Sequence, residues 1–233
     1  MDFDSFRVLT FDCYGTLIDW EAGILNAMRT ILAEHGKNPS DEEILALFGT
    51  LESHIEASGY RPYRDVLAMV VDGFGEALRF EPSTEERTAL AESVPDWEPF
   101  DDTVVALRAL GERYRLAVIS NIDDDLFRAS AARLGVEFDE VVTAEQVGSY
   151  KPSLKNFHVA FERLGGHGPD GILHVAQSLY HDIAPSCTLG LRNVWINRRK
   201  EKKGHGATSP ATATPDLEVA NLTALSTLMC PNN

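Results

Sequence analysis

Four short stretches, far apart along the chain, carry the five polar side chains that could do chemistry. Asp12 ends the run RVLTFD, Ser120 and Asn121 end the run LAVISN, and Lys151 and Asp182 lie in SYKPS and SLYHD. A carboxylate can attack an electrophilic carbon or phosphorus and form an ester, which divides one difficult reaction into two steps. A neighbouring lysine keeps that carboxylate ionised, while hydroxyl, amide and backbone N–H groups bind the anionic oxygens of a substrate. These residue types predict nucleophilic catalysis by a carboxylate.

Buried strands must position these side chains. The β-branched and apolar runs that predict strands are Arg7–Asp12, Leu116–Ser120, Val141–Ala144, Ile172–Ala176 and Val194–Asn197. Helical patterns over Asp124–Leu134, Ser153–Leu164 and Ile183–Leu189 alternate with the later runs. This alternation is typical of a parallel sheet in an α/β fold. Because ligands bind beyond the carboxyl ends of such strands, we expect the polar positions to meet at one edge of the sheet.

The segment 20–95 breaks this alternation. It contains four helical patterns, Ala22–His35, Asp41–Ser58, Arg64–Phe80 and Thr84–Ser93, with prolines near the joints. Ser40 and Ser83, each followed by acidic residues, are typical of helix N-caps. We therefore predict a helical cap domain at 20–95, inserted after the first strand of an α/β core domain formed by 1–19 and 96–233. The polar segment 198–215 is predicted as a surface loop before a last helix near Leu217–Met229.

Composition narrows the classes of function. Among 233 residues, 44% are apolar and 24% are charged, which is ordinary for a folded domain. The formal net charge of -15 disfavours binding to nucleic acid or to acidic membranes, although it permits a small anionic substrate. The three cysteines, Cys13, Cys187 and Cys230, have no metal-ligand spacing and favour a reduced compartment. The chain shows neither a signal peptide nor an apolar run that could span a bilayer, so we expect a cytoplasmic location.

The order of the motifs DCYGTL, ISN, YKPS and SLYHD resembles the haloacid dehalogenase superfamily, from Arg7 to the strand ending VWINRR. The resemblance implies a Rossmann-like α/β hydrolase fold with a helical cap. It also implies that Asp12 is the covalent nucleophile, Lys151 its electrostatic partner and Asp182 the acid of the last motif. Thr16 occupies a further catalytic position by the same resemblance. Homodimers are common in that family.

Two positions distinguish the chain from the magnesium phosphatases of that superfamily. Those enzymes carry a second aspartate two residues after the nucleophile, which protonates the leaving alcohol, and here that position is Tyr14. They also usually have an acid five residues before the last aspartate, and here that position is Gln177. A hard cation prefers anionic oxygens, so we expect no cofactor, and magnesium only if the chain were a phosphatase. The pattern is similar to the L-2-haloacid dehalogenases, which work without metal, and predicts attack at carbon.

The implied substrate is a short 2-haloalkanoic acid, in which Asp12 displaces the halide at C2. Water activated near Asp182 and Lys151 would then hydrolyse the ester. The predicted substrate-binding residues are Cys13, Tyr14, Ser120, Asn121, Ser178, Tyr180, His181, Arg61 and Arg64.

The leaving group is left open by the sequence. The cap arginine that receives the halide in the dehalogenases has no counterpart in the segment 41–49, and Arg61 or Arg64 is the predicted substitute. The motif SLYHD is similar to a side branch that acts on other carbon electrophiles, including fluoroacetate-type substrates and strained rings such as azetidine carboxylate. The alternatives are therefore ring opening, a magnesium-dependent phosphatase, or a non-catalytic binding module.

Overall fold

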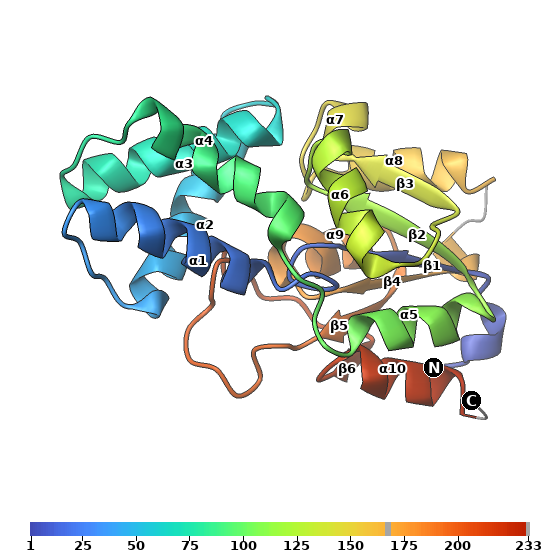
Figure 1. Cartoon of the computed structure of the whole chain (residues 1–233). Helices are drawn as coiled ribbons and strands as arrows, with labels where there is room; N and C mark the ends of the chain where they lie inside the picture. The colour runs from blue at the N-terminus through green and yellow to red at the C-terminus, as the bar shows by residue number, and fades with distance from the viewer. Residues whose placement is uncertain (166–168, 232–233) are drawn as a thin grey trace.

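The computed structural model describes residues 1–165 and 169–231, and its centre is a parallel sheet of six strands (Figure 1). The strand order is β3-β2-β1-β4-β5-β6. The strands are β1 (Val8–Phe11), β2 (Arg115–Ser120), β3 (Glu140–Thr143), β4 (Ile172–Ala176), β5 (Arg192–Ile196) and β6 (Leu217–Val219). The predicted parallel α/β fold is confirmed.

Both faces of the sheet are covered, because successive side chains of a strand point to opposite faces. Val8, Ala117 and Ile119 pack with Phe157 of helix α8 (Leu154–Arg163) on one face. Leu9 and Phe11 belong to the larger core on the other face, which α5 (Thr103–Gly111) and α10 (Leu222–Met229) help to form. Figure 1 shows α5 and α10 side by side below the strands. The remaining helices of this half are α6 (Asp124–Leu134), α7 (Ala144–Val147) and α9 (Ala184–Thr188).

Four helices between β1 and α5 pack on one another at one end of the molecule (Figure 1). They are α1 (Trp20–Glu34), α2 (Asp41–Ala57), α3 (Tyr63–Leu78) and α4 (Thr84–Ser93). Ser40 and Ser83 cap α2 and α4, each in a reciprocal capping box with a glutamate three residues later, as the sequence predicts. We call these four helices the cap; the predicted domain boundaries stay a prediction. No helix within the described residues is long and apolar enough to cross a membrane.

The structure corrects the prediction for the C-terminal part. Residues Leu217–Val219 form β6 instead of a helix, because their backbone pairs with the free edge of β5. The helix begins only at Leu222, where Asn221 provides the N-cap. The predicted helix Ile183–Leu189 is present as the short α9, and a π-helical turn, Leu179–Ile183, precedes it.

The segment 198–215 is more than the predicted surface loop. Ala207 is fully buried, and its backbone lies against α2 at Gly49. A Cβ atom at Gly49 would meet the carbonyl oxygen of Ala207 at 2.4 Å, so only glycine permits this approach. Apart from Ala207 and Thr208, the segment is the exposed or half-buried loop that the sequence predicts, but composition does not show where its backbone docks. This contact joins the segment, which we call the docking loop, to the cap.

Candidate active site

Asp12 lies directly after β1, and hydrogen bonds fix both of its carboxylate oxygens. Oδ1 accepts from Lys151 Nζ at 2.8 Å, and Oδ2 accepts from the hydroxyl of Thr16 at 2.7 Å. The Thr16 hydroxyl in turn accepts from the backbone N–H of Gln177 at 2.9 Å. Since that oxygen already receives one proton, its own proton is directed to Asp12. The carboxylate is therefore oriented before any substrate binds.

Lys151 joins Asp12 to the acid of the last motif. Its Nζ lies 2.7 Å from Asp182 Oδ1 and donates to the carbonyl oxygen of Ile119 at 2.8 Å, in addition to its bond with Asp12. Only 1% of the side chain is exposed. The three acceptors satisfy all three donors of the ammonium group. The structure thus brings together the three residues that the sequence predicted as catalytic partners.

The pKa values of these groups follow from burial and from their pairing. Burial alone would lower the pKa of Lys151, but the carboxylates of Asp12 and Asp182 raise it above its ordinary value. Burial would raise the pKa of Asp182, yet Lys151 and His174 lower it to about 2. Burial raises the pKa of Asp12, and Lys151 opposes that shift. Lys151 is therefore a permanent cation that favours the ionised form of the nucleophile.

Two buried residues that the sequence analysis missed, Thr10 and His174, form a hydrogen-bonded chain to Asp182. His174 Nε2 lies 3.0 Å from Asp182 Oδ1, and His174 Nδ1 lies 2.9 Å from the hydroxyl of Thr10. Both side chains are fully buried in neighbouring strands. The signal was present in the sequence, since Thr10 and His174 are polar residues inside the apolar runs of β1 and β4. Their role is to hold the carboxylate of Asp182 in place.

A cavity of about 40 Å³ opens above these residues, at the carboxyl ends of β1, β2 and β4. Three buried polar atoms in its wall have no hydrogen-bond partner among the described residues: Ser120 Oγ, His181 Nε2 and Asp182 Oδ2. Ser178 Oγ accepts from the backbone N–H of His181 at 2.9 Å and lies 3.3 Å from His181 Nδ1. If that hydroxyl donates to Nδ1, the neutral imidazole carries its proton on Nε2. Burial lowers the pKa of His181 to about 4, so the ring is neutral at physiological pH.

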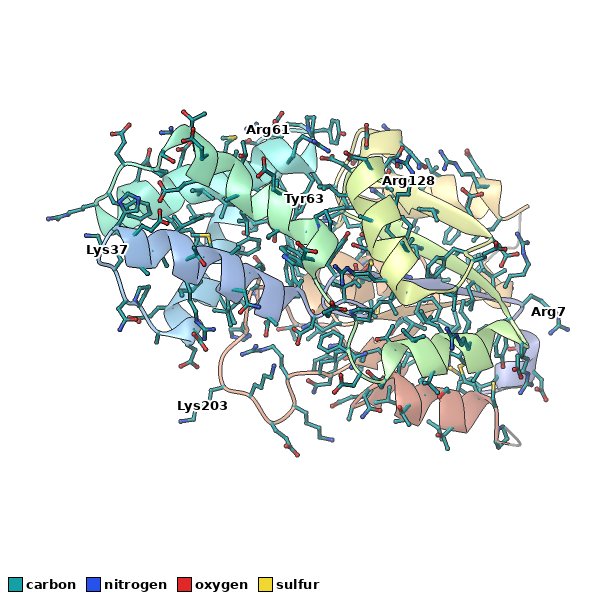
Figure 2. The ribbon with its side chains drawn as sticks, in the orientation of Figure 1. Arg7, Lys37, Arg61, Tyr63, Arg128 and Lys203 are labelled. Atoms are coloured by element: carbon teal, nitrogen blue, oxygen red, sulfur yellow. The ribbon has the colours of Figure 1, made fainter. Side chains whose placement is uncertain are left out.

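The cap contributes two acids and a tyrosine to the same cavity, none of which the sequence analysis singled out. Glu52 Oε1 accepts from the hydroxyl of Tyr63 at 2.5 Å, and Glu56 lies 3.4 Å from Asn121 Nδ2. Figure 2 shows Tyr63 at the junction between the cap and the sheet. A signal existed, because Glu52 continues the buried face of α2 one turn after Phe48. A carboxylate on an apolar helix face is costly unless something compensates for its charge.

The structure places the other predicted substrate-binding residues unevenly. Tyr14, Ser120, Asn121, Ser178 and His181 line the cavity. Cys13 is buried in the core instead, and Tyr180 lines a neighbouring cavity with Tyr60 and Tyr150. Trp20 is both buried and part of the cavity wall, together with Gln177 and with Thr208 of the docking loop.

Neither arginine predicted to replace the halide-binding arginine lies in the cavity wall. Arg61 donates to Ser58 Oγ at 2.8 Å, and Figure 2 shows it at the top of the cap, on the side toward the rest of the molecule. Arg64 forms ion pairs with Asp123 and Asp125. Lys151 is the only lysine or arginine among the described residues that line the cavity.

The carboxylate oxygens that could bind a metal at this site are not arranged for a magnesium ion. Both oxygens of Asp12 and one of Asp182 are already bound by Lys151, Thr16 and His174. Within residues 1–165 and 169–231, no group of three or more histidine, cysteine or acidic side chains is placed to hold a metal. Tyr14, at the position of the phosphatase acid, directs its hydroxyl to Ser130 Oγ at 2.8 Å. We therefore derive no step through a metal.

A parallel sheet with an aspartate–lysine–aspartate group at its carboxyl edge, covered by a helical cap, defines an α/β enzyme of the hydrolase class. A family model described as haloacid dehalogenase-like hydrolase matches residues 6–184. The chain belongs to this family.

Its relatives divide between two chemistries. Pyrimidine 5'-nucleotidase YjjG of Escherichia coli strain K12 is 26% identical over 161 residues, which cover 68% of this chain and 69% of that protein. (S)-2-haloacid dehalogenase 4A of Burkholderia cepacia is 24% identical over 202 residues, which cover 84% and 85%. The solved structure of L-2-haloacid dehalogenase from Xanthobacter autotrophicus has a TM-score of 0.79 at 20% identity and covers 98% of this chain and 100% of its own. These neighbours confirm the fold.

Proposed function

We propose that this enzyme hydrolyses short 2-substituted carboxylic acids through an ester formed by Asp12 at carbon, with halide as the first leaving group to test. The observation that carries the proposal is the setting of Asp12. Its carboxylate is oriented by Lys151 and Thr16 and lines the cavity, while Tyr14 replaces a second acid. Displacement of a halide needs a nucleophile but no general acid, whereas departure of an alcohol from phosphorus needs one.

In the first step an oxygen of Asp12 attacks C2 of the substrate, and the bond from C2 to the leaving group breaks with its electron pair. In the second step a water molecule attacks the carboxyl carbon of Asp12. The bond between that carbon and the ester oxygen breaks, which releases the 2-hydroxy acid and regenerates Asp12. One proton of this water goes to the departing ester oxygen, and the other passes to solvent. Asp182 Oδ2, which is buried and has no partner among the described residues, supports a role for Asp182 in orienting the water.

Burial of Tyr14 supports carbon as the electrophile. Burial raises the pKa of its hydroxyl well above the ordinary value, so the proton stays on the ring oxygen at neutral pH. A hydroxyl so weakly acidic, and already paired with Ser130, is a poor proton donor to a leaving alcohol. The reaction as proposed needs no cofactor. The predicted homodimer and cytoplasmic location stay predictions.

The proposal is tested by single-turnover hydrolysis in oxygen-18 water. The panel contains chloro-, bromo- and fluoroacetate, both 2-chloropropionate enantiomers, and azetidine-2-carboxylate. If Asp12 forms an ester, the solvent label enters the Asp12 peptide and is absent from the first-turnover product. Label in that product with an unlabelled peptide would mean direct attack by water and would overturn the proposal.

A second candidate is a small-molecule phosphatase, favoured by the similarity to the nucleotidase. Hydrolysis of p-nitrophenyl phosphate that requires magnesium and is lost with EDTA would support it. The same assay without metal, on the same preparation, gives the baseline.

A further inference from the structure

The wall of the catalytic cavity is strongly acidic. Among the described residues, four carboxyl groups line it, those of Asp12, Asp182, Glu52 and Glu56, against the single ammonium of Lys151. That ammonium already donates to Asp12, Asp182 and a backbone carbonyl, so it has no donor left for a substrate. A simple carboxylate anion would therefore find no cation with a free donor among the described residues of this wall.

No lysine or arginine in the part of the chain that the structure describes forms an ion pair with the two cap acids, Glu52 and Glu56. Only 4% of Glu52 is exposed, and 6% of the Glu56 side chain. Among the described residues, their one ion-pair contact runs from Glu56 Oε2 to His181 Nε2, at 3.8 Å, and this ring is neutral. Burial raises the pKa of Glu52 to about 7, and burial together with Glu52 raises that of Glu56 well above its ordinary value. Two buried carboxyl groups one helical turn apart lower the stability of the fold unless a ligand compensates for them.

The sheet side of the cavity offers hydrogen-bond donors, and His181 lies next to Glu56. Ser120 Oγ is 1% exposed and has no partner among the described residues, and His181 Nε2 is likewise without a hydrogen bond. Both are donors once the imidazole carries its proton on Nε2. A substrate carboxylate would thus be received on the sheet side, while the cap side would receive positive charge.

From this arrangement we infer that the substrate is a small zwitterion, a 2-substituted carboxylic acid whose protonated amine binds between Glu52 and Glu56. The inference rests on the proposed function for the site and for Asp12 as nucleophile, and it adds the charge of the substrate. An ammonium group can donate to both glutamates at once and restores their ionised forms. Tyr63 keeps one oxygen of Glu52 fixed through its 2.5 Å hydrogen bond.

The test compares two ligands that differ in a ring amine. L-Azetidine-2-carboxylate and cyclobutanecarboxylate both carry a four-membered ring and a carboxylate, but only the first is a cation at its ring. Calorimetry on Asp12→Asn, which cannot form the ester, measures binding without turnover. The azetidine is expected to bind about tenfold or more tightly than the cyclobutane, since charge pairs in buried sites give differences of this order.

Substitutions in the cap test whether Glu52 and Glu56 cause the preference for the azetidine over the cyclobutane. Glu52→Gln and Glu56→Gln, each in the Asp12→Asn background, should remove most of it, whereas Glu76→Gln, an exposed glutamate on α3, should leave it unchanged. Thermal unfolding of every variant shows that it is folded. Equal affinity of the two ligands, tighter binding of the cyclobutane, or no binding of either at millimolar concentration would overturn the inference.

The outcome is separable from that of the proposed function. A cation preference without oxygen-18 in Asp12 of the active enzyme would refute the ester mechanism alone. Label in Asp12 together with equal binding of the two ligands would refute cation recognition alone.

Discussion

The side-chain amide of Asn121 forms hydrogen bonds with both the backbone N–H and the backbone carbonyl of Lys151. Its Oδ1 accepts from the N–H of Lys151 at 2.7 Å, and its Nδ2 donates to the carbonyl oxygen of Lys151 at 3.1 Å. Asn121 follows β2, and Lys151 follows the helix after β3, so these bonds tie two neighbouring strand ends together. The position of the catalytic ammonium is thus set by an amide that does not touch it.

Replacing Asn121 by alanine should lower kcat more than it raises KM, because the ammonium loses its fixed position while the cavity keeps its charges. We expect a decrease of about 10- to 100-fold, the range in which misplaced groups affect rate. Steady-state kinetics measure it. Asn26→Ala, on the exposed face of α1, is the control, and an unchanged kcat in Asn121→Ala would contradict the positioning role.

Replacing Lys151 by methionine should abolish activity and destabilise the fold. The change leaves the carboxylates of Asp12 and Asp182 facing one another in a buried site, which costs on the order of 3–5 kcal/mol of unfolding free energy. Urea unfolding measures the loss. The pKa of Asp182 should rise from about 2, so the variant should be relatively more stable at acidic pH. Lys37→Met, on the outer edge of the cap, is the matched control, and equal stability of the two variants would refute this account.

Ionisation of Glu52 should lower the free energy of unfolding as pH rises. Its folded pKa of about 7 lies above the ordinary value of 4.5, so the folded state binds its proton more tightly than the unfolded state. The resulting stability is fully present below pH 4.5 and is lost as pH rises through about 7, by on the order of 3 kcal/mol. Glu52→Gln should flatten this part of the profile of melting temperature against pH. A profile of Glu52→Gln parallel to that of the parent would contradict the assignment.

Gly49→Ala should detach the docking loop from the cap. The added methyl group would lie 2.4 Å from the carbonyl oxygen of Ala207, and backbone on both sides leaves little room to adjust. We expect a loss of about 1–3 kcal/mol of unfolding free energy and a raised KM, because Thr208 belongs to the cavity wall. Gly111→Ala, near the end of α5, meets only a leucine side chain and should be close to neutral. Similar effects of the two substitutions would show that the loop contact is unimportant.

The local pattern of apolar, polar and capping residues was sufficient to predict most of the helices and strands. The helix Thr84–Ser93 and the strand Ile172–Ala176 have the bounds predicted from sequence, since a capping serine or a β-branched run defines each one. The helix Thr103–Gly111 was not predicted, and Leu217–Val219 was predicted as helix. The second error has a physical cause, because those three residues become a strand only by pairing with the edge of β5.

The residues of the candidate site also divide into those that the sequence could predict and those that it could not. Asp12, Lys151 and Asp182 could be found because each follows a strand and belongs to a motif. Glu52, Glu56 and Thr208 could not be assigned to the cavity, since their place depends on how the cap and the docking loop pack over the sheet. Arg61 and Arg64 were chosen for their charge, but neighbouring residues bind both of them outside the cavity wall.

The position of β1 also determines when the site can form. This first strand lies between β2 and β4, so Val8 pairs with Arg115 on one side and with Ile172 on the other. During synthesis the nucleophile leaves the ribosome before the strands that bury it, which follow far later in the chain. Such long-range pairing folds slowly, because a long loop must close before the contacts form. Asp12 therefore reaches its place beside Lys151 and Asp182 only after the segment that carries Asp182 has been made.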